Sequence, residues 1–496
     1  MNKQNVRLIF GLKLKQLRIQ KGLSFAELSK AANVSVSYLN EIEKGKKYPK
    51  ADKIIALASA LGVSYDQLVS LKLNKKLAPV ADLINSGILE SLPLEMFGLE
   101  ASTLLELISG APVQFNAFIS TLLKIARNYE MTRENFFLAA LRSYQEMHDN
   151  YFEDLEQAVD TFVARHPEAA GLPVSREALL AILCDTYQYQ INWDTLDQDE
   201  LLRRFRSVYV DSKRTLYINN ALSHMQQAFL LGKEIAYNYL ELKERPATSN
   251  LDQVSSFEEV LNNFKASYFS VALLISRNQL LKDLTAFFEQ PDWQPDLLLG
   301  ILRKYEASPE MFLHRLSNLL PRYFGIDNFF FLRFNDNLLL EKDNFSITKE
   351  LHLSRLHNPH RNDLNEHYCR RWVSIRILEQ MKTRQLAGDP PEILLEVQRS
   401  RFAGTKNEYL NFSLARPNTP SPHANVSVTL GIQVDNISRK KIRFIDSARI
   451  PVREVSETCE RCSLRDCQER IAPPRVIESR TAAMALTRRL KELGDR

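Results

Sequence analysis

The first seventy residues contain five short helical patterns in close succession, and this feature restricts the fold more than any other in the chain. The patterns cover residues 12–22, 24–33, 35–45, 50–62 and 64–72. Ser24 and Ser35 stand at N-cap positions, and Gly22, Gly45 and Gly62 stand where helices would stop. Apolar residues at helical spacing predict one shared face, made by Ala26, Leu28, Ala31, Val34, Leu39 and Ile42. We therefore expect a small all-α domain over residues 1–72.

One stretch of this domain, "AELSKAANVSVSYLNEIEKGKKYP" at residues 26–49, resembles the helix-turn-helix of the phage-repressor (XRE) family. The resemblance implies that residues 35–44 lie in the major groove of double-stranded DNA. It assigns DNA contacts to Ser35, Val36, Ser37, Asn40, Glu41, Lys44, Lys46 and Lys47. Serine and asparagine hydrogen-bond base edges and valine contacts a thymine methyl group, whereas the lysines favour phosphates. The alternative is a helical protein-interaction module on the same scaffold.

Two further features of the domain follow from the same resemblance. It implies an ion pair between Arg18 and Glu43 that ties two helices together. Phe25 stands where many relatives carry a polar residue, so a phosphate contact is expected to be missing there. We call this DNA-binding domain the reader. Because one reader of this size contacts too few base pairs for useful specificity, we expect a homodimer on a two-fold operator.

The whole chain has the size and composition of a multidomain globular protein. Its 496 residues exceed what one core accommodates, and 45% are hydrophobic and 25% charged. The net charge of +5 predicts a local basic patch rather than a basic surface. With no signal-peptide pattern and no long apolar run, we expect a cytoplasmic protein without membrane contact. Five cysteines argue against a disulfide framework, and Cys184 is expected to be a small buried hydrophobe on an apolar helix.

Helical patterns continue to about residue 320. Residues 73–150 are interpreted as a helical linker or dimerisation region, which ends near a segment rich in proline, glycine and alanine. Residues 214–240 and 260–277 resemble the ImmA/IrrE metallopeptidase-like family, whose members place H-E-x-x-H on one helix and a third ligand on the next. The resemblance assigns a mainly helical, peptidase-like domain to residues 151–322.

The residues at the metal positions of that family have changed in this chain. The two histidines correspond to Lys233 and Tyr237, the general base to Glu234 and the third ligand to Lys265. An ammonium group has no lone pair for zinc and repels the ion, so we expect no zinc at this degenerate centre and no enzymatic activity. The centre is then a scaffold or a ligand pocket. The alternative is a helical core unrelated to peptidases, in which Glu234 is a surface charge.

Beyond residue 323 the pattern changes from helices to strands. Alternating or β-branched apolar runs predict strands over 328–334, 392–400, 408–417 and 425–435, and a helix is predicted over 478–494. Residues 323–496 are therefore expected to form an α+β domain. The predicted fold class is multidomain, with an all-α reader, a mainly helical middle and an α+β C-terminal domain.

Three cysteines fall within nine residues, "CERCSLRDC", with the spacing C-x2-C-x4-C. Thiolates at this spacing converge on one centre, but Cys459, Cys462 and Cys467 alone do not close a tetrahedral site. Cys369, in "EHYCRRW", is the best fourth ligand, with His367 as a substitute. Such a site holds structural zinc or a 4Fe–4S cluster, and the spacing does not decide between them. The site would fasten the C-terminal helix to the core of its domain.

The reader, the degenerate centre and the cysteine motif together resemble the short-chain fatty-acyl regulators of the XRE family, which respond to propionate or acetate. The resemblance implies a sensor of acyl-coenzyme A in the C-terminal region and favours the 4Fe–4S cluster. The candidate cations for such an effector are Arg370, Arg371, Lys440, Lys441 and Arg443. We expect a DNA-binding transcriptional regulator controlled by a metabolite or redox sensor. The alternatives are a metallopeptidase-linked DNA-binding regulator and an antitoxin-like protein that binds a partner.

Overall fold

The computed structural model describes residues 3–70, 133–248, 254–337, 345–353, 366–389, 392–420 and 424–494. The chain divides into two compact units. The first comprises Met1–Ala140 with Val254–Glu258, and the second comprises Leu141–Gln253 with Glu259–Arg496. Residues 71–132, most of the predicted linker, lie outside the described residues.

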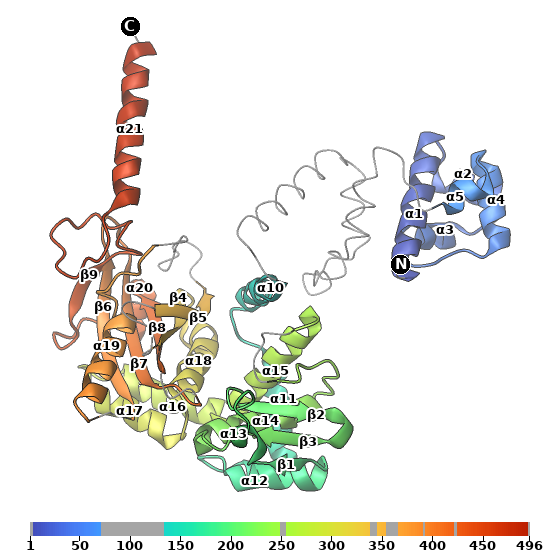
Figure 1. Ribbon diagram of the computed structural model, residues 1–496. Coiled ribbons are helices and arrows are strands. Elements are labelled where there is room, and N and C mark those ends of the chain that lie inside the picture. The colour runs from blue at the N-terminus through green and yellow to red at the C-terminus, as the bar shows by residue number, and fades with distance from the viewer. Residues whose placement is uncertain are drawn as a thin grey trace. The chain divides into compact units, whose positions relative to one another are not determined.

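The first unit contains the helix-turn-helix domain. Its helices are α1 (Lys3–Gln20), α2 (Phe25–Ala32), α3 (Val36–Glu43), α4 (Ala51–Leu61) and α5 (Tyr65–Val69) (Figure 1). The hydroxyl oxygens of Ser24 and Ser35 accept hydrogen bonds from the first turns of α2 and α3. Gly22, Gly45 and Gly62 have φ values between 66° and 70°, which favour glycine. The predicted caps and stops are therefore confirmed.

The core of this domain differs in one detail from the predicted apolar face. Leu28 and Ala32 are buried one helical turn apart on α2, whereas Ala26 and Ala31 are exposed. The prediction was wrong for these two alanines because alanine has too little side chain to mark the buried face of a helix. The core is completed by Phe10, Leu14, Val34, Leu39, Ile42, Ile54, Leu57, Ala58, Leu61 and Leu68.

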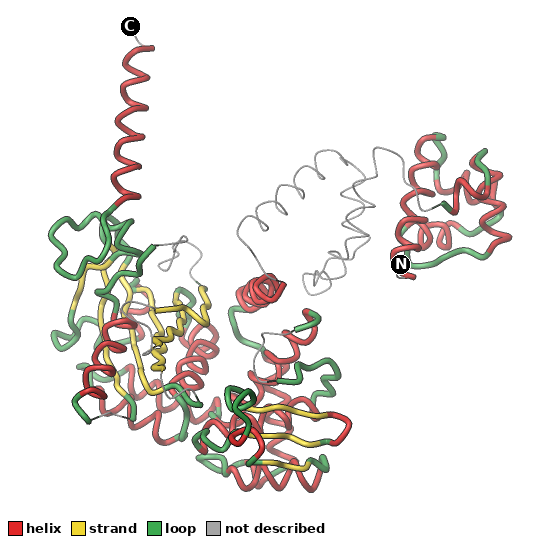
Figure 2. Tube along the Cα trace, in the orientation of Figure 1, coloured by secondary structure: helices red, strands yellow, loops and turns green. Residues whose placement is uncertain are grey.

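The middle of the chain, before the large sheet, is mainly helical and also holds a small sheet. Its helices are α10 (Arg133–Met147), α11 (Glu153–Arg165), η2 (Pro167–Ala169), α12 (Arg176–Ala181), η3 (Ile182–Thr186), α13 (Thr195–Gln198), η4 (Asp211–Lys213), α14 (His224–Tyr239) and α15 (Phe257–Leu274). The strands β1 (Gln190–Asn192), β2 (Ser207–Val210) and β3 (Thr215–Ile218) form a sheet in the order β1-β3-β2 (Figure 2). These strands are only three or four residues long, which is too short for a clear alternating pattern.

The C-terminal region is built on a six-stranded sheet in the order β5-β4-β8-β7-β6-β9. Its strands are β4 (Phe329–Asn337), β5 (Phe345–His352), β6 (Leu394–Phe402), β7 (Glu408–Pro417), β8 (Ala424–Gln433) and β9 (Val452–Val455). The four predicted strands correspond to β4, β6, β7 and β8, and the predicted helix to α21 (Arg475–Gly494). The boundary predicted at residue 322 falls within the second unit, at the end of η5 (Leu320–Phe324).

Helices cover both faces of this sheet (Figure 1). Helix α19 (Val373–Leu386) packs on the face that carries Phe330, Phe334 and Tyr409. The opposite face carries Phe331 and Phe412 and meets α16 (Arg277–Phe288), α17 (Pro295–Lys304) and α18 (Pro309–Leu319). The short helix α20 (Asn436–Lys441) follows β8.

Candidate DNA interface, ion-pair centre and thiol cluster

Helix α3 carries the predicted base-reading residues. Val36 is 47% exposed and Ser37 is exposed, while Asn40 and Glu41 are half-buried. The Ser35 hydroxyl accepts a hydrogen bond of 3.1 Å from the Tyr38 backbone N–H, so it caps the helix. Val36 and Ser37 therefore offer the most accessible contacts at the start of this helix, where the family reads bases. The assignment of bases to residues stays a prediction.

The predicted phosphate-binding lysines follow α3. Lys44 is the C-cap residue of that helix, and Lys46 and Lys47 are exposed. The Lys47 ammonium lies 2.8 Å from a carboxylate oxygen of Glu41. Because both side chains are solvent-accessible, this pair contributes little to stability and leaves Lys47 able to exchange it for a phosphate.

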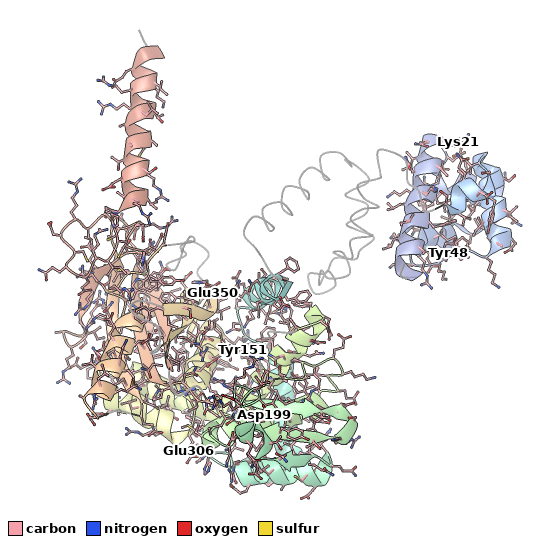
Figure 3. The ribbon with its side chains drawn as sticks, viewed as in Figure 1. Lys21, Tyr48, Tyr151, Asp199, Glu306 and Glu350 are labelled. Atoms are coloured by element: carbon pink, nitrogen blue, oxygen red, sulfur yellow. The ribbon has the colours of Figure 1, made fainter. Side chains whose placement is uncertain are left out.

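A buried ion pair joins α1 to α3, as the resemblance implied. The Arg18 Nε and Nη2 groups donate to the two carboxylate oxygens of Glu43 at 2.7 and 2.9 Å. The guanidinium carbon of Arg18 also lies 4.0 Å from the centre of the Phe25 ring. Phe25 therefore supports the arginine that holds α3 in place. Tyr48, labelled in Figure 3, packs on Phe10 with 5.0 Å between ring centres.

Lys233, Glu234, Tyr237 and Arg245 form what we call the ion-pair centre. An Nη2 group of Arg245 donates to both carboxylate oxygens of Glu234 at 2.7 and 2.6 Å, and the Tyr189 hydroxyl donates to the same carboxylate at 3.2 Å. The Arg245 guanidinium also lies 4.2 Å from the centre of the Tyr237 ring. Glu234, which the resemblance equates with the general base of the family, is thus held in a buried ion pair.

The other changed positions lie around the same helix. The Lys233 ammonium donates to Asn263 Oδ1 at 2.5 Å, and burial lowers the pKa of Lys233 to about 8. Lys265 is half-buried on α15. Glu234 is 5% exposed, so the alternative in which it is a surface charge is wrong. Arg245 was missed because it stands in a loop with no helical or strand pattern around it.

Two segments distant in the sequence meet at the cysteines. An antiparallel bridge pairs Tyr368 with Thr458, and the Cys459 N–H donates to the His367 carbonyl at 2.8 Å. Cys369, Cys459 and Cys462, which we call the thiol cluster, are 5–6% exposed. The structure therefore places the upstream cysteine beside two cysteines of the C-terminal motif.

Charged side chains fasten these two segments to each other. Arg461 donates to both carboxylate oxygens of Glu366 at 2.7 and 3.0 Å. Glu460 accepts a hydrogen bond from the His367 N–H at 2.9 Å, and its other oxygen lies 2.8 Å from the His367 ring. The Trp372 indole N–H donates to the Ser456 carbonyl at 2.8 Å. His367, the substitute ligand, is thus engaged with a carboxylate.

The surroundings of the thiol cluster determine its charge. Burial, with smaller contributions from the neighbouring Cys462 and Cys459, raises the pKa of the Cys369 thiol to about 11, although two backbone N–H groups favour its thiolate. Cys467 is half-buried, and Arg470 donates to the carbonyls of Cys459 and Cys462 at 2.7 and 3.1 Å. Over the described part of the chain, no three His, Cys, Asp or Glu side chains are arranged to hold a metal ion.

The candidate effector cations lie on two different elements. Arg370 is buried with its guanidinium 4.6 Å from the centre of the Phe345 ring, and Arg371 lies 3.8 Å from a carboxylate oxygen of Glu469. Lys440 and Lys441, at the end of α20, are exposed, as is Arg443 just beyond it. Arg370 and Arg371 therefore adjoin the thiol cluster.

The prediction for Cys184 was wrong, because this cysteine is exposed. It lies in η3, a π-helical turn that follows α12. The wider turn shifts the residues out of the 3.6-residue period on which the prediction of a buried face depended. Cys184 is also remote in sequence from the thiol cluster and serves below as a matched control.

Two parts of the chain match known families. Residues 14–68 match the helix-turn-helix family, and residues 192–317 match the IrrE N-terminal-like domain. The propionyl-CoA carboxylase regulator of Cereibacter sphaeroides is 24% identical over 344 residues, which cover 66% of this chain and 68% of that protein. The regulator RamB of Mycobacterium tuberculosis is 22% identical over 329 residues, which cover 62% of this chain and 65% of that protein.

A solved structure, a Mycobacterium tuberculosis transcriptional regulator, aligns with a TM-score of 0.46 and 20% identity over 68% of this chain and 93% of that one. The family matches and the regulator relatives confirm the predicted function class, a DNA-binding transcriptional regulator with a helix-turn-helix domain. They also confirm the peptidase-like nature of the middle. Within the described ranges, no helix has the length and apolar character of a membrane span.

Proposed function

We propose that this chain is a cytoplasmic, non-enzymatic transcription factor that binds double-stranded DNA as a homodimer and is controlled by its C-terminal region. Helix α3 carries the proposal, because it is capped, fixed by the Arg18–Glu43 pair, and presents Val36 and Ser37 to solvent. An acyl-coenzyme A or similar effector would favour one dimer arrangement, whose two readers match the operator spacing. One of the two relatives above is named a propionyl-CoA carboxylase regulator, which supports this choice of effector.

The reading helix is tested by selecting bound duplexes from a random pool with the full-length protein. We expect a two-fold sequence, and substitution Ser37→Ala or Asn40→Ala should weaken binding to it by about 1–3 kcal/mol while leaving non-specific binding unchanged. Ser59→Ala, at an exposed position of α4, is the matched control. Equal loss of specific and non-specific binding in Ser37→Ala would show that the wrong face of α3 was chosen.

The phosphate contacts are tested separately by salt dependence. Lys46→Ala should weaken binding to specific and non-specific duplexes alike, and should lower the slope of log affinity against log salt by about one. An unchanged slope would mean that this lysine does not contact a phosphate.

We further propose that Cys369, Cys459, Cys462 and Cys467 hold a 4Fe–4S cluster or a zinc ion. Support comes from the burial of three of these thiols, from the electrostatic effect of Cys459 and Cys462 on Cys369, and from the backbone N–H groups that face Cys369. When bound, the metal would stabilise thiolates that burial alone disfavours and would brace the two segments. Anaerobic purification with iron, sulfide and zinc analysis distinguishes the two, since a colourless protein with one zinc excludes the cluster.

The ion-pair centre supports the non-enzymatic part of the proposal. The resemblance places Lys233 and Tyr237 at the family's histidine positions, and neither side chain is a usual zinc ligand. Arg245 is ion-paired with Glu234, the carboxylate that would act as general base. Proteolysis of a cognate repressor that stops on chelation would favour the metallopeptidase-linked alternative. Purification with a tightly bound toxin would favour the antitoxin-like alternative.

A further inference from the structure

Three cations, on strands β5, β4 and β7, lie on one face of the large sheet. Arg333 on β4 pairs with Lys349 on β5 and with Val428 on β8, so these side chains share a face. Arg416 on β7 pairs with Val426, two residues from Val428 on the same strand. Because alternate residues of a strand point to the same side, Arg416 lies on that face as well.

This face also receives α18, whose first turn carries Glu310. A carboxylate oxygen of Glu310 lies 3.2 Å from Arg333 Nε, and the Lys349 ammonium binds the other oxygen. Arg206, in the loop before β2, adds a fourth cation, since its charge interacts with those of Glu310, Arg333 and Arg416. Among the described residues, four cations therefore lie around the Glu310 carboxylate.

Three of the cations are at least partly withdrawn from bulk water. Arg333 is 8% exposed, and Arg206 and Arg416 are half-buried. Burial first, and then the charges of Arg206 and Arg333, lower the pKa of Arg416 to about 10, although the Glu310 carboxylate acts in the opposite direction. The Arg416 Nη1 group donates to the Pro417 carbonyl at 2.8 Å. A carbonyl oxygen carries only a partial negative charge. Such repulsion is costly unless an anion offsets it.

We propose that Arg206, Arg333, Lys349 and Arg416 bind a small anion that carries phosphate groups and at least two negative charges. Guanidinium groups match phosphate oxygens through pairs of parallel hydrogen bonds. The burial of Arg333 excludes a DNA duplex, which needs an open surface, and Lys349, whose side chain is 59% exposed, marks the solvent side. Glu350, labelled in Figure 3, follows Lys349 on β5 and binds Arg142.

The site would connect two parts of the second unit. Arg206 belongs to the peptidase-like middle, whereas Arg333, Lys349 and Arg416 belong to the large sheet. Beside it, the Thr419 hydroxyl donates to Gln226 Oε1 on α14 at 2.8 Å. A bound anion would add a charged link between the sheet and the middle, separate from the thiol cluster. Because acyl-coenzyme A carries phosphate groups, the inference deepens the effector part of the proposed function and rests on that part, but it concerns neither the reader nor the cysteines.

The test is calorimetric titration of the full-length protein with inorganic diphosphate at constant ionic strength, with inorganic phosphate and sulfate as comparison anions. We expect saturable binding that is tightest for diphosphate, and a rise in melting temperature that matches it. Arg416→Gln should weaken diphosphate binding about tenfold or more, since charged hydrogen bonds to phosphate are lost. Arg384→Gln, which removes the arginine of an exposed ion pair with Asp389, is the control and should bind diphosphate as tightly as the unchanged protein does.

Folding and binding are separated by the same variant without ligand. Because Arg416→Gln removes a repelled cation, it should melt at or above the temperature of the unchanged protein while losing diphosphate binding. Binding that is absent at millimolar diphosphate, or equal in Arg416→Gln, would overturn the inference. A variant that melts lower and also loses binding would overturn the charge argument. Failure of DNA binding would instead concern only the proposed function.

Discussion

By sequence, both the ion-pair centre and the thiol cluster are related to metal binding. The two sites differ in the partners of their ionisable side chains. In the ion-pair centre, Glu234 is held by Arg245 and Lys233 by Asn263. In the thiol cluster, burial keeps Cys369 in its neutral form, and the charged pairs lie around the sulfurs rather than on them. The first site has internal partners for its charges, whereas the second would gain a cationic partner only from the metal that we propose for it.

The largest effect should come from removing one thiol. Cys462→Ser is expected to reduce metal content from full occupancy to background, because three sulfurs cannot complete the site. If the metal is structural zinc, up to about 10 kcal/mol of binding free energy is lost with it. Metal analysis and thermal unfolding measure both effects. Cys184→Ser, at the exposed cysteine, should change neither. Unchanged metal in Cys462→Ser would show that the ligand set is wrong.

The next effect tests whether the charges of the ion-pair centre depend on each other. Arg245→Met leaves the Glu234 carboxylate buried without its cation and should lower the free energy of unfolding by about 3–5 kcal/mol. Denaturant unfolding measures this loss. The double variant Glu234→Gln, Arg245→Met should recover most of the loss, because no isolated charge remains. If the double variant is as unstable as the single one, the loss reflects packing rather than charge.

The comparison also shows what the sequence could predict. The strand over 408–417 was predicted with its observed bounds, because the buried β7 is rich in apolar and aromatic residues. The edge strands β5 and β9 were missed, since most of their residues are half-buried or exposed and lack a clear apolar pattern. The residue pattern of a strand therefore predicts its bounds only where most of its residues are buried.

The sites follow the same rule. Cys369 was linked to the C-terminal motif because thiols are rare in this chain and their chemistry restricts their use. Arg245 was missed, and Arg206, Arg333 and Arg416 were not recognised as a group, because arginines are common in any sequence. Strand register places Arg333 and Arg416 on one face, and Arg206 comes from a loop of the middle. A cluster formed by tertiary structure from frequent residue types leaves no signal in one sequence.

The pH dependence of stability separates the two sites further. Lys233 has its pKa lowered to about 8 in the folded protein, against about 10.4 when unfolded. The unfolded chain therefore binds more protons between these values, so this group makes stability rise as pH increases from about 8 to about 10.4. Lys233→Met should abolish that rise and add on the order of 3 kcal/mol at neutral pH.

Denaturant unfolding at several pH values measures the effect of Lys233. Lys441→Met, at the exposed end of α20, removes one lysine charge without burial and controls for net charge. A stability curve for Lys233→Met with the same slope as the unchanged protein would mean that its ammonium is solvated. The ion-pair centre would then be open to ligands, and its contrast with the thiol cluster would disappear.

The smallest effect concerns the bonds that position the thiols. Trp372→Phe removes the indole N–H that donates to the Ser456 carbonyl. Trp372 stands three residues after Cys369, and Ser456 stands three residues before Cys459. Groups outside the ligand shell set the orientation of metal ligands, and their loss lowers affinity by about 10–100-fold. We expect the lower end of that range, because Arg461–Glu366 and His367–Glu460 still join the two segments.

Competition with a chelator measures this change in metal affinity, and Trp193→Phe, at a half-buried tryptophan of the middle, is the matched control. If Trp372→Phe binds metal as tightly as the unchanged protein, the two segments are positioned by the metal and not by their own bonds. The thiol cluster would then resemble a site that forms only on binding, and the ion-pair centre would be the only one of the two that is organised by the fold itself.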